Sequence, residues 1–367
     1  MQGYLQLKNL SVGYNGKSVV SNINININKG EIIALIGPNG AGKSTILKTV
    51  SRGLELIQGE IILENKSLKE YSYEELSKKM AVILTERIRP ELMTCKDIVA
   101  TGRYPYTGRL GLLKKNDEEK IYDALSAVDC LDLADKDFNN ISDGQRQRIL
   151  LARAICQEPQ IILLDEPTSY LDIRNKLELL SVLIRMAKKN NITVITSLHE
   201  IDLAQKVADR IITIGDNDTV EVGTPDNIFE EKKIKCLYHI DNGSYDTVFG
   251  SIEMQKPTGD APRIFVIAGG KEGYSVFREL QRENIPFAAG VLYENDVDYA
   301  IAKHLAAYIV TEKPYCEISS RSIDEAKQMI DKCSSVICTL KTIGDTNKRI
   351  AELIEYAKKE GKLCQRL

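Results

Sequence analysis

The feature that most constrains this chain is a glycine-rich loop enclosed by a short apolar run and a helical stretch. Residues 31–37 read EIIALIG, a continuous apolar run that is typical of a buried parallel strand. The residues from 37 onward, GPNGAGKST, satisfy the pattern G-x-x-x-x-G-K-[ST]. A loop of this kind between a strand and a helix directs its backbone amides toward a bound phosphate group. The sequence therefore predicts an α/β core that holds the phosphates of a nucleotide.

The loop and one upstream aromatic residue are the expected ATP contacts. Lys43 would neutralise the β- and γ-phosphates, and Ser44 would offer its hydroxyl group to Mg²⁺. Tyr14, in the turn-rich segment VGYNGK, can stack on adenine, a contact worth roughly 1–3 kcal/mol. The full expected set is Tyr14, Gly37, Pro38, Asn39, Gly40, Ala41, Gly42, Lys43, Ser44 and Thr45.

Two further apolar runs end in side chains that suit phosphate chemistry. Residues 161–167 read IILLDEP, so Asp165 ends a buried strand, where a carboxylate can hold Mg²⁺. Glu166 can reach a water aligned with the γ-phosphate and act as a general base. Residues 192–200 read ITVITSLHE, and a strand here beside the first would bring His199 to the γ-phosphate. Glu166 and His199 are therefore the predicted catalytic residues, and Asp165 joins Ser44 as a predicted Mg²⁺ ligand.

Composition restricts the class of protein. The chain has 367 residues, of which 43% are apolar and 28% charged, and its formal net charge is −3. These values are ordinary for a soluble globular protein, and nothing global attracts nucleic acid or anionic lipid. No apolar run approaches the roughly 20 residues needed to span a bilayer. The first residues, MQGYLQLKNL, lack the pattern of a signal peptide, so we expect a cytoplasmic protein.

The order of strand-like and helical patterns predicts two domains. SNINININ, at 21–28, alternates isoleucine with asparagine, as an antiparallel strand with one wet face does. Residues 94–156 carry helical patterns only, and a polar stretch at 254–263 with two prolines indicates a boundary. We expect an α/β domain over 1–255 with a small β layer and a helical insert. A smaller parallel α/β domain of Rossmann-like type should follow over 262–367.

A glycine turn in the second domain is the remaining candidate site. Gly269, Gly270 and Gly273 follow a strand-like run and open a helix, as a nucleotide-binding turn would, without completing G-x-G-x-x-G. Two interpretations stay open. The domain binds a small regulatory ligand at these glycines, or it is a structural or protein-contact domain.

Taken in order, the motifs of residues 1 to about 240 resemble those of the ATP-binding cassette (ABC) ATPases of membrane transporters. GPNGAGKST resembles Walker A, ISDGQRQR the signature, IILLDEP Walker B, SYLD the D-loop and His199 the switch histidine. The resemblance implies a RecA-like core with an antiparallel β subdomain and a helical subdomain. It also implies a homodimer in which each signature closes on the ATP held by the other protomer. The residues acting across that interface would be Ser142, Asp143, Gly144 and Gln145 of the signature and Asp172 of the D-loop.

The segment ATGRYPYTGRL is similar to the cassettes of importers for iron–siderophores, haem and vitamin B12. It implies an ATPase that acts on the inner face of the cell membrane and drives a separate integral-membrane permease. An extracytoplasmic substrate-binding protein would deliver the chelate. The alternative is a soluble, non-transport ABC ATPase acting in cofactor assembly or on nucleic acid. A basic stripe and a long coiled-coil insertion, which would favour the nucleic-acid version, are missing from the sequence.

Two positions depart from the family pattern. Thr85 stands where the Q-loop glutamine is expected, with Glu86 beside it, and either side chain would replace glutamine at Mg²⁺. Asp143 places a carboxylate in the signature, where a helix N-terminus favours it by roughly 0.3–1 kcal/mol. Repulsion from a phosphate charge at ~8 Å, with an effective dielectric constant of ~20, would be about 2 kcal/mol. We therefore predict that Asp143 points away from the phosphates, toward its own helical subdomain or the permease side.

Overall fold

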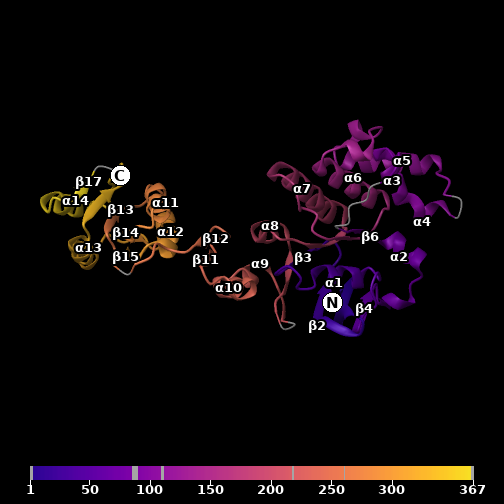
Figure 1. Cartoon of the computed structure of the whole chain (residues 1–367), viewed down its shortest axis with the longest axis horizontal. Coiled ribbons are helices and arrows are strands. Elements are labelled where there is room, and N and C mark those ends of the chain that lie inside the picture. The colour runs from indigo at the N-terminus through magenta and orange to yellow at the C-terminus, as the bar shows by residue number, and fades with distance from the viewer. Residues whose placement is uncertain (1–2, 85–89, 109–110, 217–218, 260, 365–367) are drawn as a thin grey trace. The chain divides into compact units, whose positions relative to one another are not determined.

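The computed structural model divides into two compact units, Met1–His239 and Ile240–Leu367 (Figure 1). Each unit has its own sheets and its own apolar core. The described residues are 3–84, 90–108, 111–216, 219–259 and 261–364.

The division falls earlier than the boundary indicated by the proline-containing stretch. The division falls earlier because a two-stranded hairpin, formed by β11 (Gly243–Asp246) and β12 (Ser251–Met254), belongs to the second unit. Arg278 of helix α11 (Tyr274–Arg282) donates to Glu253 of this hairpin, with an Nη1–Oε2 distance of 2.5 Å. The second unit therefore begins with the hairpin, and the proline-containing stretch lies inside that unit.

A six-stranded sheet forms the centre of the first unit. Its strands lie in the order β10-β9-β3-β8-β7-β6, with β9 and β10 antiparallel and the other neighbours parallel. The three apolar runs predicted as buried strands form β3, β7 and β8, and every residue of these strands is buried. The bounds are β3 (Ile32–Ile36), β6 (Met80–Ile83), β7 (Ile161–Leu164), β8 (Thr193–Ser197), β9 (Arg210–Ile214) and β10 (Val220–Gly223).

An antiparallel sheet and helix α1 (Lys43–Val50) pack on one face of the central sheet. Its strand order is β2-β1-β4-β5. The predicted alternation is confirmed, because Ile23, Ile25 and Ile27 are buried while the asparagines between them are exposed. The bounds are β1 (Leu5–Tyr14), β2 (Lys17–Ile27), β4 (Gln58–Leu63) and β5 (Lys66–Ser67).

Helices cover the other face of the central sheet, as the helical patterns of 94–156 predicted (Figure 1). They share one apolar core with the side chains that β6, β7 and β8 direct toward this face. After the β9–β10 hairpin the chain forms two short helices, α9 and α10. The bounds are α2 (Tyr73–Lys79), α3 (Cys95–Ala100), α4 (Tyr104–Thr107), α5 (Lys115–Ala127), α6 (Asp143–Cys156), α7 (Ile173–Asn190), α8 (Ile201–Val207), α9 (Pro225–Ile228) and α10 (Glu231–Tyr238).

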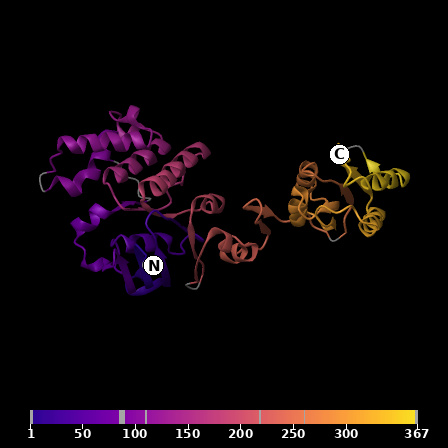
Figure 2. The ribbon, with the colours of Figure 1, turned by 180° about the vertical axis from the view of Figure 1, so that it is seen from behind.

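The second unit contains the predicted parallel α/β arrangement. Its five-stranded sheet has the order β15-β14-β13-β16-β17, with all neighbours parallel. Helices α11 and α12 pack on one face, and α13 and α14 on the other (Figure 2). Within the described residues of both units, no helix combines the length and apolar character required to cross a membrane. The remaining bounds are β13 (Ile264–Ile267), β14 (Phe287–Tyr293), β15 (Tyr308–Glu312), β16 (Ser335–Cys338), β17 (Leu363–Cys364), α12 (Val297–Leu305), α13 (Ser320–Lys332) and α14 (Ile350–Lys359).

Candidate nucleotide site

The predicted phosphate loop joins β3 to α1, and its backbone requires glycine at two positions. Gly37 has a φ of 149°, and an added Cβ would lie 2.1 Å from the carbonyl oxygen of Ile214. Gly42 has a φ of 106°, and an added Cβ would lie 2.5 Å from Val20 Cγ2. Any larger residue would meet both a strained backbone and a steric clash. The two glycines therefore fix the shape of the loop.

Lys43 is held inside this loop. Its Nζ donates to the carbonyl oxygens of Gly37 and Pro38, each at 2.8 Å. Burial lowers the pKa of Lys43 below its ordinary value, and the charges of Glu166 and Asp165 oppose that shift. The ammonium group is thus bound by oxygens of its own loop and lies within the electrostatic influence of two carboxylates.

A cavity of about 240 Å³ opens at the loop and brings three motifs together. Strands β7 and β8 are hydrogen-bonded neighbours, so the residues that follow them reach the same edge of the sheet. That edge supplies Glu166 and His199 to the cavity wall. The complete lining is Asn39, Gly40, Gly42, Lys43, Ser44, Thr45, Glu166 and His199.

Ser197 connects the acidic residues at this edge. Its Oγ donates to Asp165 Oδ1 at 2.8 Å and accepts the Glu166 amide hydrogen, with an N–O distance of 2.7 Å. His199 Nε2 lies 2.6 Å from Glu166 Oε1. We did not single out Ser197 from the sequence, although its position as a hydroxyl residue at the end of an apolar strand, two residues before His199, is a usable signal.

The predicted Mg²⁺ ligands fit that ion by their chemistry. Ser44 lines the cavity, and Asp165, at 5% exposure, follows β7 directly before Glu166 of the cavity wall. A hydroxyl group and a carboxylate form an all-oxygen donor set, which Mg²⁺ prefers. Thr85 and Glu86, the candidates at the Q-loop position, lie outside the described residues.

Tyr14 lies beside the loop at the end of β1. Thr45 Oγ1 donates to Tyr14 Oη at 3.3 Å, and the tyrosine is 46% exposed. A half-exposed ring at the edge of the loop presents a surface on which a base can stack.

The signature segment forms the start of α6 and carries a complete capping box. Ser142 Oγ accepts the Gln145 amide hydrogen, and Gln145 Oε1 accepts the Ser142 amide hydrogen at an N–O distance of 3.0 Å. Asp143 Oδ1 accepts from Arg146 Nη1 at 2.8 Å. Arg146 belongs to the same helix, so this carboxylate is paired within α6, and its direction relative to the phosphates stays a prediction.

Asn175 of α7 links the signature to the D-loop of the same chain. Asp172 caps α7 by accepting from the backbone amide of Asn175 at 2.8 Å and from Asn175 Nδ2 at 2.9 Å. Asn175 also packs on Gly144, where an added Cβ would lie 2.4 Å from Asn175 Cγ. The signature residues do not line the described cavity of their own chain. We did not anticipate Asn175 as the link between the two motifs.

The glycine turn of the second unit binds the domain's own carboxylates. The Gly270 amide donates to Asp296 Oδ2, and the Gly273 amide donates to Asp298 Oδ2, each at 2.8 Å. Asp298 is fully buried, and burial raises its pKa. The amides that could hold a phosphate therefore already donate to carboxylates of the same domain, which counts against an anionic ligand. A small ligand at Gly269, Gly270 and Gly273 stays a prediction.

Comparisons with known proteins agree with this division of the chain. A family model described as ABC transporter matches residues 20–169, and one described as the MJ0874 family matches residues 287–365. The chain is similar to the uncharacterized ABC transporter ATP-binding protein MJ0873 of Methanocaldococcus jannaschii. The two are 41% identical over 288 residues, which cover 78% of this chain and 99% of that protein.

Two further proteins extend the similarity. The petrobactin import ATP-binding protein FpuD of Bacillus anthracis is 34% identical over 252 residues, 68% of this chain and 92% of that protein. Among solved structures, CbiO1 of Clostridium perfringens, part of the ABC transporter complex CbiONQ, has a TM-score of 0.55 and 27% identity. That match covers 64% of this chain and 93% of the solved one.

Proposed function

The chain belongs to the family of ABC transporter ATP-binding proteins, and on that premise we propose that it powers import of a metal chelate through a separate permease. It is an ABC transporter ATPase with an added C-terminal domain of the MJ0874 family. ATPases of this family dimerise and work with permeases. The proposed cargo is an iron–siderophore, haem or cobalamin.

The convergence of the loop, Glu166 and His199 on one cavity carries the catalytic part of this proposal. The loop amides and Lys43 hold the β- and γ-phosphates. Glu166 takes the proton of the attacking water while the bond between the γ-phosphorus and the ADP oxygen breaks. His199, in contact with Glu166, orients that carboxylate. Mg²⁺ held by Ser44 and Asp165 would neutralise charge on the β- and γ-phosphates.

The signature completes the site across a head-to-tail dimer in this proposal. Ser142, Gly144 and Gln145 lie at the start of α6, a helix of 14 residues. A helix N-terminus presents unpaired amides and the positive end of the helix dipole. These properties suit the γ-phosphate of ATP bound by the partner subunit. Asp172, which touches the signature through Asn175, would belong to the same interface.

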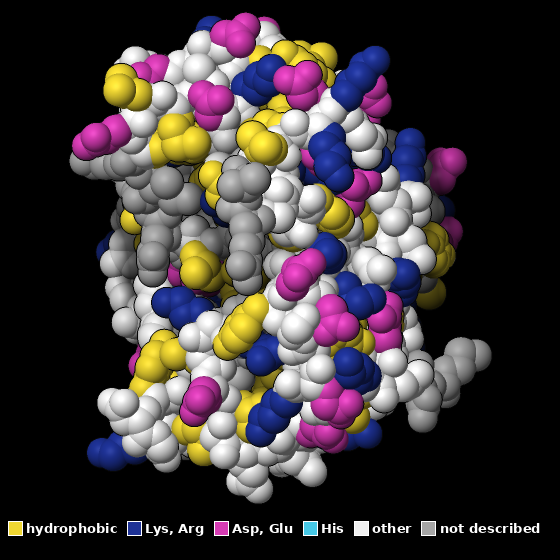
Figure 3. All heavy atoms as spheres, turned by 90° about the vertical axis from the view of Figure 1, so that its right-hand side faces the viewer, with side chains coloured by type: hydrophobic (Ala, Val, Ile, Leu, Met, Phe, Trp, Pro, Cys, Tyr) yellow, Lys and Arg dark blue, Asp and Glu magenta, His cyan; other side chains and the backbone are white. Residues whose placement is uncertain are grey.

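The chelate class rests on the importer-like segment at 100–110 and on the similarity to a petrobactin importer. The cytoplasmic side of the membrane is the place where such an ATPase would contact its permease. On the face shown in Figure 3, lysines and arginines are interspersed with acidic side chains. That face therefore offers no basic stripe in support of the nucleic-acid alternative.

Reconstituted transport tests the function. The full chain, co-expressed with its permease in proteoliposomes, would receive a ferric siderophore, haem or cobalamin together with the substrate-binding protein. We expect ATP-dependent accumulation of one of these chelates, and none with the Lys43→Ala chain. ATP turnover without accumulation of any of them, and without retention of the chain by the permease, would favour a non-transport ATPase.

A further inference from the structure

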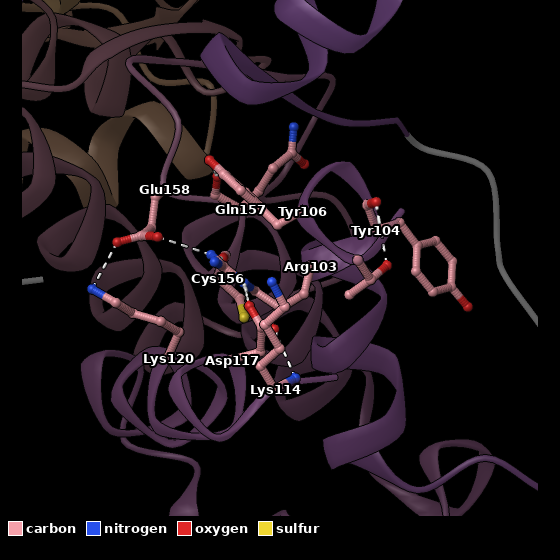
Figure 4. Close-up of polar contacts among 10 residues, drawn as sticks. Arg103, Tyr104, Tyr106, Lys114, Asp117, Lys120, Cys156, Gln157 and Glu158 are labelled. Carbon is pink, nitrogen blue, oxygen red and sulfur yellow. Dashed lines mark hydrogen bonds and ion pairs between the residues drawn. The ribbon is translucent and has the colours of Figure 1, made fainter. Parts of the chain in front are cut away.

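Arg103 is a buried arginine that none of the nucleotide-binding motifs contains. It lies directly before α4, is 3% exposed, and stacks its guanidinium on the ring of Tyr106 at 4.1 Å from the ring centre (Figure 4). Its Nη1 donates to the carbonyl oxygen of Cys156 at 2.7 Å. Cys156 is the last residue of α6, where carbonyl groups lack partners within the helix and the helix dipole is negative. The guanidinium therefore caps the end of α6 opposite the signature.

The same guanidinium pairs with two carboxylates. Nε donates to Asp117 Oδ1 and Nη1 donates to Glu158 Oε2, each at 2.9 Å (Figure 4). Asp117 is 4% exposed, and its Oδ2 accepts the amide hydrogen of Lys114 at the start of α5. Glu158 Oε1 pairs with Lys120 of α5 at 2.7 Å. One planar group thus joins the end of α6 to the beginning of α5.

Neighbouring residues hold this junction against the rest of the unit. Gly102 approaches α6 so closely that an added Cβ would lie 2.3 Å from the carbonyl oxygen of Arg153. Gln157, directly after α6, donates its Nε2 to the carbonyl oxygen of Met80 at 2.8 Å, and Met80 begins β6 of the central sheet. The end of α6 is therefore fixed to α5 by Arg103 and to the central sheet by Gln157.

From these contacts we propose that Arg103 is a positioning residue for ATP hydrolysis, because it sets the direction of the helix that presents the signature. At a rise of 1.5 Å per residue, the 14 residues of α6 span about 21 Å. A tilt of about 5° at Cys156 therefore moves Ser142 by about 2 Å. A misplacement of about 1 Å at a reacting site can cost about 100-fold in rate. The inference rests on the proposed dimer, in which the signature meets ATP of the partner subunit.

The test measures ATP-driven dimerisation of the full chain by sedimentation in a Glu166→Gln background, with and without Arg103→Lys. Lysine keeps the positive charge, but as a point charge it cannot reach Asp117, Glu158 and the Cys156 carbonyl group together. We expect the dimer dissociation constant to rise about 10- to 100-fold. ATP affinity of the single chain, measured by nucleotide titration, should stay the same. With Glu166 restored, Arg103→Lys should lower kcat and leave KM for ATP unchanged.

Arg185→Ala is the matched control. Arg185 is an exposed arginine that donates to the carbonyl oxygen of Ala127, at the end of α5, and its loss should leave the dissociation constant unchanged. If Arg103→Lys fails to fold, Arg103→Met combined with Asp117→Asn removes the charge from both partners, so that no buried carboxylate at 117 loses its cation.

The outcomes separate the two proposals. Absence of an ATP-driven dimer in the Glu166→Gln parent would contradict the proposed function, and with it the role of Arg103. Equal dimer dissociation constants for the Glu166→Gln parent and its Arg103 variants would overturn the positioning role alone. An equal loss of ATP affinity and dimerisation would reduce Arg103 to a residue required for folding, and would also overturn it.

Discussion

His199 Nε2 and Glu166 Oε1 lie 2.6 Å apart on the wall of the nucleotide cavity. The contact joins the predicted switch histidine to the predicted general base, so a second side chain orients the carboxylate that we propose as the base. Glutamine at 166 keeps the size of this side chain and removes its basicity, and general base catalysis typically supplies about 10²- to 10⁴-fold in rate.

Glu166→Gln should therefore bind ATP normally, hydrolyse it at least about 100-fold more slowly, and accumulate as an ATP-bound dimer. Phosphate release and sedimentation measure the two effects. Glu74→Gln, which changes an exposed glutamate on α2 paired with Lys78, is the control and should behave as the wild type. Wild-type turnover in Glu166→Gln would remove Glu166 as the base.

Lys43→Ala should lose nucleotide binding. Each charged hydrogen bond that the ammonium group makes to phosphate is worth about 1.5–3 kcal/mol, so we expect ATP affinity to fall at least about tenfold. Calorimetric titration measures it. Lys48→Ala, five residues further along the same helix, is the control and should keep its affinity. Unchanged affinity in Lys43→Ala would contradict the assignment of the phosphate loop.

Gly144→Ala should disturb the D-loop through Asn175. The new methyl group would take the place of the Asn175 side chain, which bonds to Asp172. A double-mutant cycle of Gly144→Ala and Asn175→Ala, read as ATP-driven dimerisation in the Glu166→Gln background, should give a coupling energy of about 0.5–3 kcal/mol. Additive effects of the two changes would show that the contact between Gly144 and Asn175 does not contribute to dimerisation.

Glu312→Gln should alter the acid stability of the second unit. Burial opposes ionisation of Glu312, but hydrogen bonds from the amides of Ser319 and Lys313 outweigh it and lower the pKa to about 2. A carboxyl group whose pKa is lower in the folded state stabilises the fold above its unfolded pKa, about 4.3, and this contribution disappears as pH falls toward about 2. The difference in unfolding free energy between wild type and variant should therefore be constant near neutral pH and shrink below about pH 4.3.

Urea denaturation at several pH values measures this difference. Glu317→Gln, which changes an exposed glutamate in the segment before α13, is the control and should show a much smaller difference. A difference for Glu312→Gln that is independent of pH would contradict the role of its charge.

Removing the second unit should leave basal ATP turnover close to that of the full chain if that unit is regulatory. The result depends on where the chain is cut. Deletion of residues 240–367 removes the whole second unit. Deletion of 260–367 keeps the β11–β12 hairpin and removes Arg278 from Glu253 and His304 from Ser244. We expect the longer remnant to melt at a lower temperature and to aggregate more. Unfolding of the ATPase unit after the cut at 240 would contradict a regulatory role.

The strands that carry the site were predictable because a buried parallel strand is a continuous apolar run, which a single sequence displays. β3, β7 and β8 are runs of this kind, and residues that follow within a few positions of their ends line the cavity. The glycines of the phosphate loop were predictable for a similar reason, since the pattern is local and its backbone conformation excludes larger residues.

Contacts between distant segments were not predictable in this way. Asn175 lies 31 residues after Gly144, and Asp298 lies 25 residues after Gly273, so neither pair leaves a periodic trace in the sequence. The glycine turn has the pattern of an anion site, while the carboxylate that engages it follows a different strand. The place of the β11–β12 hairpin in the second unit has the same origin, because it depends on a long-range contact made by Arg278.

The capping box at the start of α6 uses the two side chains of Ser142 and Gln145 as acceptors only. Its two bonds use the oxygen of the Ser142 hydroxyl and the oxygen of the Gln145 amide as acceptors. Neither bond uses the hydroxyl proton of Ser142 or the Nε2 protons of Gln145. These protons can therefore donate to an acceptor that approaches the start of the helix, such as a phosphate oxygen. The capping box thus uses only acceptor atoms of the two side chains and leaves their donors for a ligand.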